Sequence, residues 1–234
     1  MRWGIAGATI VAALAVAVTI ASVSGRAWAA SSGPAASYWH IGYYTPSGRA
    51  LSLASAPAAS GSVASLNFTN QDNTALLVTN NAGQFPTLLG NLTGKSVSAT
   101  FTISGLNADQ SFTYYGEGVG ACGVSKSVNV RYFFETSSAG GFDETHYWWS
   151  NPVAINLNTV NDSATLATVP LTGANWSDFY GHFGNDPAYS AGFDAAVSHV
   201  TMIGLSFGGG CFFENGVGTS DGSGTFTLNT FTVS

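Results

Sequence analysis

The sequence predicts an all-β protein: a two-sheet antiparallel jelly-roll sandwich with one short helix near 187–198. The first reason is that apolar and polar residues alternate along many short segments, which is the period of a half-buried strand. The second is that the breaks between these segments are rich in Gly, Asn, Asp and Ser, which favour turns. About ten short strands joined by polar turns are typical of a two-sheet sandwich.

The clearest strand is expected at 96–104, where Val97, Ala99, Phe101 and Ile103 alternate with Ser and Thr. The same alternation predicts strands at 62–69 and 127–135. The segment 224–233 changes phase by one residue in its middle, which indicates a bulge or bend. Weaker patterns predict further strands at 38–44, 74–79, 111–116, 145–150, 152–157, 164–171, 200–207 and 211–214.

One segment has helical rather than strand periodicity. Asp186 followed by Pro187 is typical of a helix N-cap and first position. Phe193, Ala196 and Val197 then follow at the spacing of one helical face. We therefore expect the short helix near 187–198 to lead directly into the strand at 200–207.

The first thirty residues are predicted to be a secretory signal peptide, which leaves residues 31–234 as a single domain. Arg2 supplies a basic start, Ile5–Val23 is an almost unbroken apolar run, and Ala27 and Ala29 form an A-x-A cleavage site. An uncleaved membrane anchor is the alternative, because the run is long enough to span a bilayer. We expect a secreted, extracellular protein that has no membrane contact after cleavage.

The charge of the exported chain excludes one large class of partner. Residues 31–234 carry four basic and twelve acidic side chains, a net charge of −8. Nucleic-acid binding needs clustered Lys and Arg, so nucleic acid is not an expected partner. Charged residues make up only 8% of the chain, so Ser, Thr, Asn and Gly must cover most of the surface. Such a surface suits neutral, hydroxylated ligands.

The two cysteines, Cys122 and Cys211, both follow the predicted signal peptide. An even number of cysteines in an exported protein favours a disulfide between them. A catalytic cysteine is the weaker alternative, because no partner histidine can be identified from the spacing.

The segment "YWWSNP" (147–152) is the best candidate for a ligand site. In an extended strand Trp148 faces one side of the sheet, while Tyr147 and Trp149 face the other. We expect Trp148 in the core and the other two rings facing outward, where aromatic faces could stack on sugar rings. His146, Asn151 and Glu144 are the polar neighbours that could fix the ligand's orientation. The alternative is that both sets of rings are structural.

Sequence motifs typical of catalytic sites match this chain only weakly. Gly204–Gly208 matches G-x-S-x-G with Ser206 as nucleophile. That motif requires a helix after the serine, and no helix is predicted there. Glu135 and other carboxylates could form a glycosidase pair, although none share a strand face at close spacing. Asn70 and Asp72 are candidate ligands of a structural calcium, because their side-chain oxygens are the kind of ligand that calcium prefers. The same residues also favour turns.

The segments 169–184, 191–219 and 224–233 resemble secreted bacterial jelly rolls of the galactose-binding-domain-like, carbohydrate-binding-module-like kind. The shared features are a Trp-Ser-Asp turn, a short helix, a strand ending in a Gly run and a final strand. The resemblance implies ligand-binding loops or a concave sheet face, often with a structural calcium, but carries over no catalytic residue. We predict a secreted, non-catalytic glycan- or polysaccharide-binding protein. The alternatives are a structural or adhesive exoprotein and, third, a secreted hydrolase.

Overall fold

The computed structural model describes residues 38–44, 51–57, 61–70, 74–114, 127–137, 143–208 and 216–234. Contacts divide the chain into Met1–Ser31 and Ser32–Ser234, and every described residue belongs to the second unit. The predicted signal peptide, Cys122, Cys211, Asp72 and the strand expected at 211–214 lie outside the described residues.

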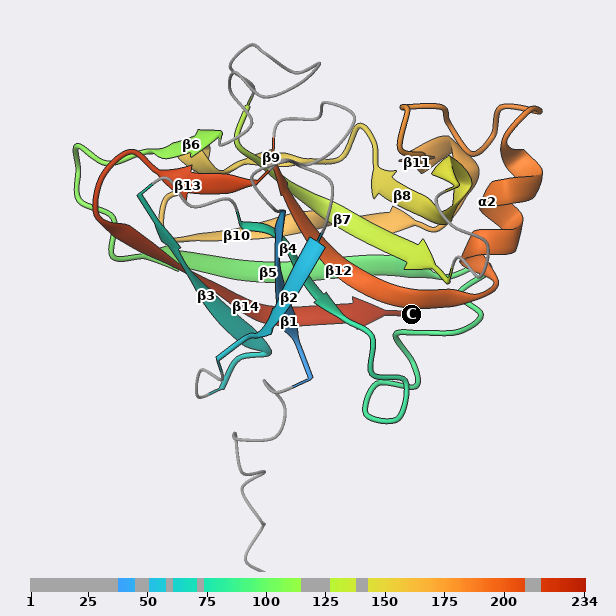
Figure 1. Ribbon diagram of the computed structural model, residues 1–234, viewed down its shortest axis with the longest axis horizontal. Coiled ribbons are helices and arrows are strands. Elements are labelled where there is room, and N and C mark those ends of the chain that lie inside the picture. Colours follow the sequence, from blue (N-terminus) through green and yellow to red (C-terminus); the bar gives the residue numbers. More distant parts are fainter. Residues whose placement is uncertain are drawn as a thin grey trace, which may run out of the picture. The chain divides into compact units, whose positions relative to one another are not determined.

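The described residues form two antiparallel sheets packed face to face, as the sequence predicts (Figure 1). The larger sheet has the order β11-β8-β7-β12-β4-β1-β2, with β13 paired to β4 and β6, and β9 paired to β7. Its strands are β1 (His40–Tyr44), β2 (Leu51–Ser55), β4 (Thr74–Thr79), β6 (Phe112–Tyr114), β7 (Asn129–Thr136), β8 (Tyr147–Ser150), β9 (Ile155–Asn156), β11 (Trp176–Ser177), β12 (Val200–Gly208) and β13 (Val217–Thr219). This architecture is an all-β sandwich compatible with a jelly roll.

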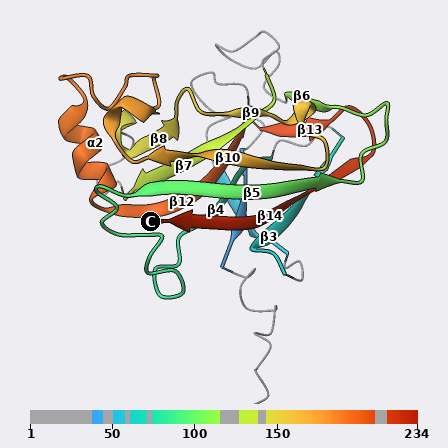
Figure 2. The same cartoon turned by 180° about the vertical axis from the view of Figure 1, so that it is seen from behind.

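The smaller sheet has the order β10-β5-β14-β3 and lies in front in Figure 2. Its strands are β3 (Ala64–Thr69), β5 (Ser96–Ser104), β10 (Ser163–Pro170) and β14 (Ser223–Val233). Strand β5 has the predicted bounds. The predicted phase change in β14 is also present, as a register shift against β5 between Leu228 and Thr230.

The space between the sheets holds the main core. Alternate residues of β5 and β14 face it, among them Phe101 and Phe226, whose rings stack at 4.7 Å. The large sheet contributes Tyr132, Phe134 and Leu205 from its inner face. A core this rich in aromatic side chains follows from the alternation of the strands, because every second residue of each faces inward.

The one α-helix among the described residues is α2 (Ser190–Val197); 3₁₀ turns occur at η2 (Glu144–His146), η3 (Leu157–Thr159) and η4 (Gly173–Asn175). Helix α2 buries Phe193, Ala196 and Val197, as predicted. It begins a few residues later than expected, because residues 187–189 form a turn instead. Asp186 stabilises that turn: its Oδ1 accepts the Ala188 N–H at 2.9 Å.

Candidate functional site

Trp148 lies in the core between the sheets, as predicted. Its ring packs edge-on against Phe193 of α2, with centroids 5.0 Å apart. Its Nε1–H donates to the Thr145 carbonyl at 2.6 Å, which satisfies the one polar group of the side chain. Trp148 therefore anchors the helix end of the sandwich.

The expectation that Trp149 is open to solvent is wrong. Its side chain does leave the sandwich interior, but only 5% of the residue is exposed. Its ring lies 5.1 Å from Phe133 and 6.3 Å from Phe179, which comes from the segment after β11. Tyr147 is half-buried against the same group. A sugar ring cannot stack on Trp149 while this segment covers it.

We call this group the outer cluster: Ala75, Leu76, Val78, Phe133, Trp149, Phe179 and Met202. Ser206 belongs to the same face and is fully buried. Its hydroxyl accepts the Trp149 Nε1–H at 3.1 Å. Ser206 thus faces away from Leu205 and Phe207, as predicted. A buried serine with this contact has no access to a substrate.

The three polar residues predicted to orient a ligand, His146, Asn151 and Glu144, have different surroundings in the structure. His146 lines a hollow of about 540 Å³ together with Thr136, His199 and residues of α2. Asn151 donates from Nδ2 to the Ser177 hydroxyl at 3.2 Å, so it joins β8 to β11. Glu144 acts electrostatically on Tyr189.

The segment from Asp178 to Tyr189 builds a candidate site around one buried carboxylate. The Asp178 side chain is fully buried. Its Oδ1 accepts the backbone N–H groups of Tyr180 and His182, each at 2.9 Å. Its Oδ2 lies 3.0 Å from Nδ1 of His182. Three contacts from one carboxylate fix the loop and orient the imidazole.

The His182 imidazole is held from its other side by Tyr189. The two rings are nearly parallel, with centroids 3.9 Å apart, and the Tyr189 hydroxyl lies 3.2 Å from Nε2. The Tyr180 ring lies 6.2 Å from His182 and 5.2 Å from Phe179. Aromatic contacts therefore run from the buried Trp149, through Phe179, to the surface at Tyr180.

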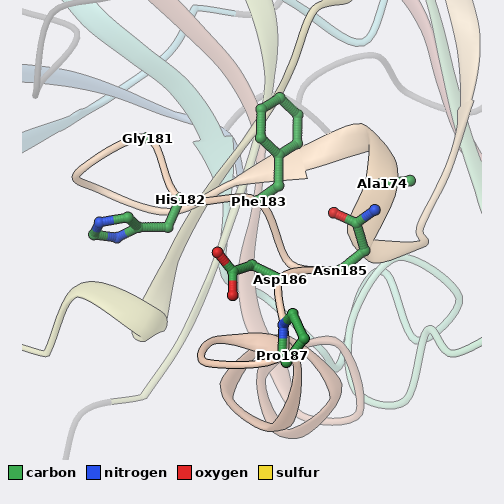
Figure 3. Close-up of a pocket in the computed structure, with 7 residues that line it drawn as sticks. All are labelled: Ala174, Gly181, His182, Phe183, Asn185, Asp186 and Pro187. Carbon is green, nitrogen blue, oxygen red and sulfur yellow. The ribbon is translucent and has the colours of Figure 1, made fainter.

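A hollow of about 730 Å³ lies beside this loop and is open to solvent. We call it the His182 hollow; it is lined by Ala174, residues 181–183 and residues 185–187. Figure 3 shows the Asp186 carboxylate on the side of His182, the Asn185 amide on the side of Ala174, and the Phe183 ring directed away from Pro187. The hollow combines an apolar ring with hydrogen-bonding groups of both kinds.

Large apolar side chains are exposed at three described positions: Leu53, Tyr180 and Phe183. Two of the three belong to this one loop, with exposed fractions of 50% for Tyr180 and 36% for Phe183. Of these two, Phe183 lines the hollow, and an exposed aromatic ring that lines a hollow is typical of a binding site rather than of an ordinary surface.

Two titratable groups near this end of the sheet have raised pKa values. Partial desolvation raises the pKa of Tyr189, and the carboxylates of Asp178, Asp186 and Glu144 raise it further by disfavouring the phenolate. Burial raises the pKa of Glu135 to about 7. Glu135 lies opposite Tyr147 in the β7–β8 ladder, at the margin of the outer cluster.

The predicted calcium site is only partly covered by the structure. Asn70 forms an isolated bridge with Thr219, and its N–H donates to the Gly222 carbonyl at 3.1 Å. Its expected partner Asp72 and the Cys122–Cys211 pair lie outside the described residues. Within the described ranges, no three His, Cys, Asp or Glu side chains gather at a spacing suited to a metal ion.

No family model matches the chain, and no curated protein matches it either. None of the helices in the described part has the length and hydropathy that a membrane crossing requires.

Sequence reasoning missed Tyr180, His182 and Phe183 as site residues. The Trp-Ser-Asp turn at 176–178 stood out only as a structural feature. The available signal was the spacing Asp178-x-Tyr180-x-His182, because Asp accepts backbone N–H groups two residues ahead in tight turns. That spacing predicts a rigid loop presenting a tyrosine and a histidine.

Proposed function

We propose that this protein is a non-catalytic glycan-binding β-sandwich and that the glycan binds at the His182 hollow. The observation that carries the proposal is an exposed aromatic ring at the hollow: Phe183 lines it, and the exposed Tyr180 belongs to the same loop. Aromatic faces pack against the C–H surfaces of sugar rings, and nearby polar groups set the orientation.

The polar groups of the hollow support the proposal because their positions are already fixed. Asp178 holds His182, and the Ala188 N–H holds the carboxylate of Asp186. A site ordered before binding loses little conformational entropy when the ligand arrives. Asn185 adds an amide, which can both donate to and accept from sugar hydroxyls.

Sequence features agree with a glycan ligand. The low charge suits neutral hydroxylated partners. The resemblance of 169–184, 191–219 and 224–233 to galactose-binding-domain-like jelly rolls points the same way, since many of them bind carbohydrate. The proposal places the protein outside the cell, exported by residues 1–30, with Cys122 and Cys211 disulfide-bonded. Mass spectrometry of the exported chain under non-reducing conditions tests both features.

The binding test is a pull-down on insoluble polysaccharides combined with a glycan array. We expect the wild-type protein to bind at least one glycan class. Tyr180→Ala and Phe183→Ala should each weaken binding about tenfold, equivalent to ~1.4 kcal/mol. Leu53→Ala is the matched control: it removes an apolar side chain that is 39% exposed but lies on β2, away from the loop.

Two results would overturn the proposal. Folded wild-type protein that binds no glycan would leave a structural or adhesive role. Glycan binding that survives both Tyr180→Ala and Phe183→Ala would place the site elsewhere. Thermal unfolding of each variant should stay close to that of the wild type, because Tyr180 is 50% exposed and Phe183 is 36% exposed.

A further inference from the structure

Among the described residues that line the His182 hollow, the permanent charge is negative. Asp186 lines the hollow, and no Lys or Arg is among the described residues that do so. Because Oδ1 of Asp186 is occupied by the Ala188 N–H, its carboxylate is fixed with the second oxygen available for a ligand. A ligand entering this hollow therefore meets an oriented negative charge.

The negative potential extends beyond Asp186. Asp178, Asp186 and Glu144 all act on the Tyr189 phenol and raise its pKa, so three carboxylates contribute negative potential at the ring that stacks on His182. The basic side chains of the described part are Lys95 and Arg131, and neither lines the hollow. A sugar bearing its own carboxylate would be repelled here.

The aromatic rings of the site also favour a positively charged ligand. Phe183 lines the hollow and is partly exposed, Tyr180 is exposed in the same loop, and aromatic faces attract cations. A ligand that combines a sugar C–H face with an ammonium group would use the rings and Asp186 together. A neutral sugar would use the rings and hydrogen bonds alone.

We infer that the His182 hollow selects sugars bearing a free amine, such as deacetylated hexosamines, over acetylated and uronic-acid sugars. This inference rests on the proposed function. The ammonium group lies against the Asp186 carboxylate, and the sugar face packs on Phe183, which lines the same hollow. Because the site is open to solvent, the charge pair contributes a preference of about two- to fivefold rather than the whole affinity.

The test compares oligomers of glucosamine, N-acetylglucosamine and galacturonic acid of equal length, by calorimetry, at a pH that keeps the sugar amine protonated. We expect the glucosamine oligomer to bind about two- to fivefold more tightly than the acetylated one, and the galacturonate oligomer most weakly. Raising the salt concentration should reduce the preference, because screening weakens exposed charge pairs.

Asp186→Asn is the informative variant. An asparagine can still accept the Ala188 N–H, so the turn before α2 is retained while the charge is removed. We expect this variant to bind the glucosamine and acetylated oligomers about equally. Asp109→Asn is the control, because it removes one exposed carboxylate in the loop between β5 and β6, at the end of the sheets away from α2 in Figure 1.

The outcomes separate this inference from the proposed function. Equal binding of glucosamine and acetylated oligomers by the wild type would overturn the inference and leave glycan binding intact. An equal loss of preference in Asp109→Asn would also overturn it, because bulk charge would then explain the effect. Binding of none of the oligomers, nor of any glycan on the array, would overturn the proposed function itself.

Discussion

The outer faces of the two sheets differ although their strands share one alternating pattern. On the large sheet, the outward residues Phe133 and Trp149 are buried by Phe179. On the small sheet, outward hydroxyls pair across strands, as in Ser98 with Thr232 at 2.7 Å, and remain exposed. Alternation therefore decides which face a residue takes, and the neighbouring loops decide whether that face meets water.

The largest effect should come from Trp149, if the outer cluster is a second core. Trp149→Ala removes a side chain that is 5% exposed and packed between Phe133 and Phe179. We expect the free energy of unfolding to fall by about 3–5 kcal/mol, as for aromatic truncation in an interior. Urea unfolding monitored by circular dichroism measures it.

The control for this variant is Tyr180→Ala, which truncates an exposed ring of the same loop. It should change the free energy of unfolding by less than about 1 kcal/mol. If Trp149→Ala cost no more than Tyr180→Ala, the outer cluster would contribute no core packing. The contrast between the two outer faces would then fail.

A smaller effect should appear at Glu135, the carboxyl at the margin of the outer cluster. Burial raises its pKa in the folded protein from 4.5 to about 7. Below about pH 4.5 the group is protonated in both states and costs no stability. As the pH rises to about 7, the unfolded chain releases the proton while the folded chain keeps it. The free energy of unfolding therefore falls, by up to about 3 kcal/mol above pH 7.

Glu135→Gln removes this titration. We expect the variant to gain stability relative to the wild type as the pH rises from about 4 to 8, most of it between pH 4.5 and 7. Urea unfolding of both proteins across this range gives the difference directly, so other titrating groups cancel. A difference that stays constant with pH would mean that the outer cluster does not desolvate Glu135.

These contrasts show how far the sequence predicts the fold. Strand β5 was predictable to the residue, because its alternation is local and unbroken. The short strands β2, β11 and β13 were not predicted. Strand β11, for instance, is only Trp176–Ser177 and is defined by its pairing with β8, a contact distant in sequence. Short segments carry too little periodicity to reveal such pairing.

The candidate site was less predictable than the fold. The prediction that Trp148 and Trp149 face opposite sides of the sheet is confirmed, because it follows from strand geometry alone. The exposure of Trp149 depends on Phe179, thirty residues later, and no local pattern contains that information. The exposed rings, Tyr180 and Phe183, instead lie in the loop after the Trp-Ser-Asp turn. Asp178 holds this loop by accepting two backbone N–H groups, and in the sequence it is recognisable only as a residue that favours turns.

The smallest effect should come from the outer face of the small sheet. Thr100 and Thr230 face each other across β5 and β14, with their hydroxyl oxygens 2.8 Å apart. Thr100→Val and Thr230→Val keep the β-branched shape and remove the hydroxyls. Because water can replace the lost hydrogen bond on an exposed face, we expect each variant to change the free energy of unfolding by less than about 0.5 kcal/mol.

The double variant completes a thermodynamic cycle for this hydroxyl pair. Its coupling energy should be a few tenths of a kcal/mol, as expected for an exposed cross-strand pair. A coupling energy above about 1.5 kcal/mol would show that the pair is withdrawn from water. In that case the outer face of the small sheet would be covered like that of the large sheet, and the difference between the two faces would disappear.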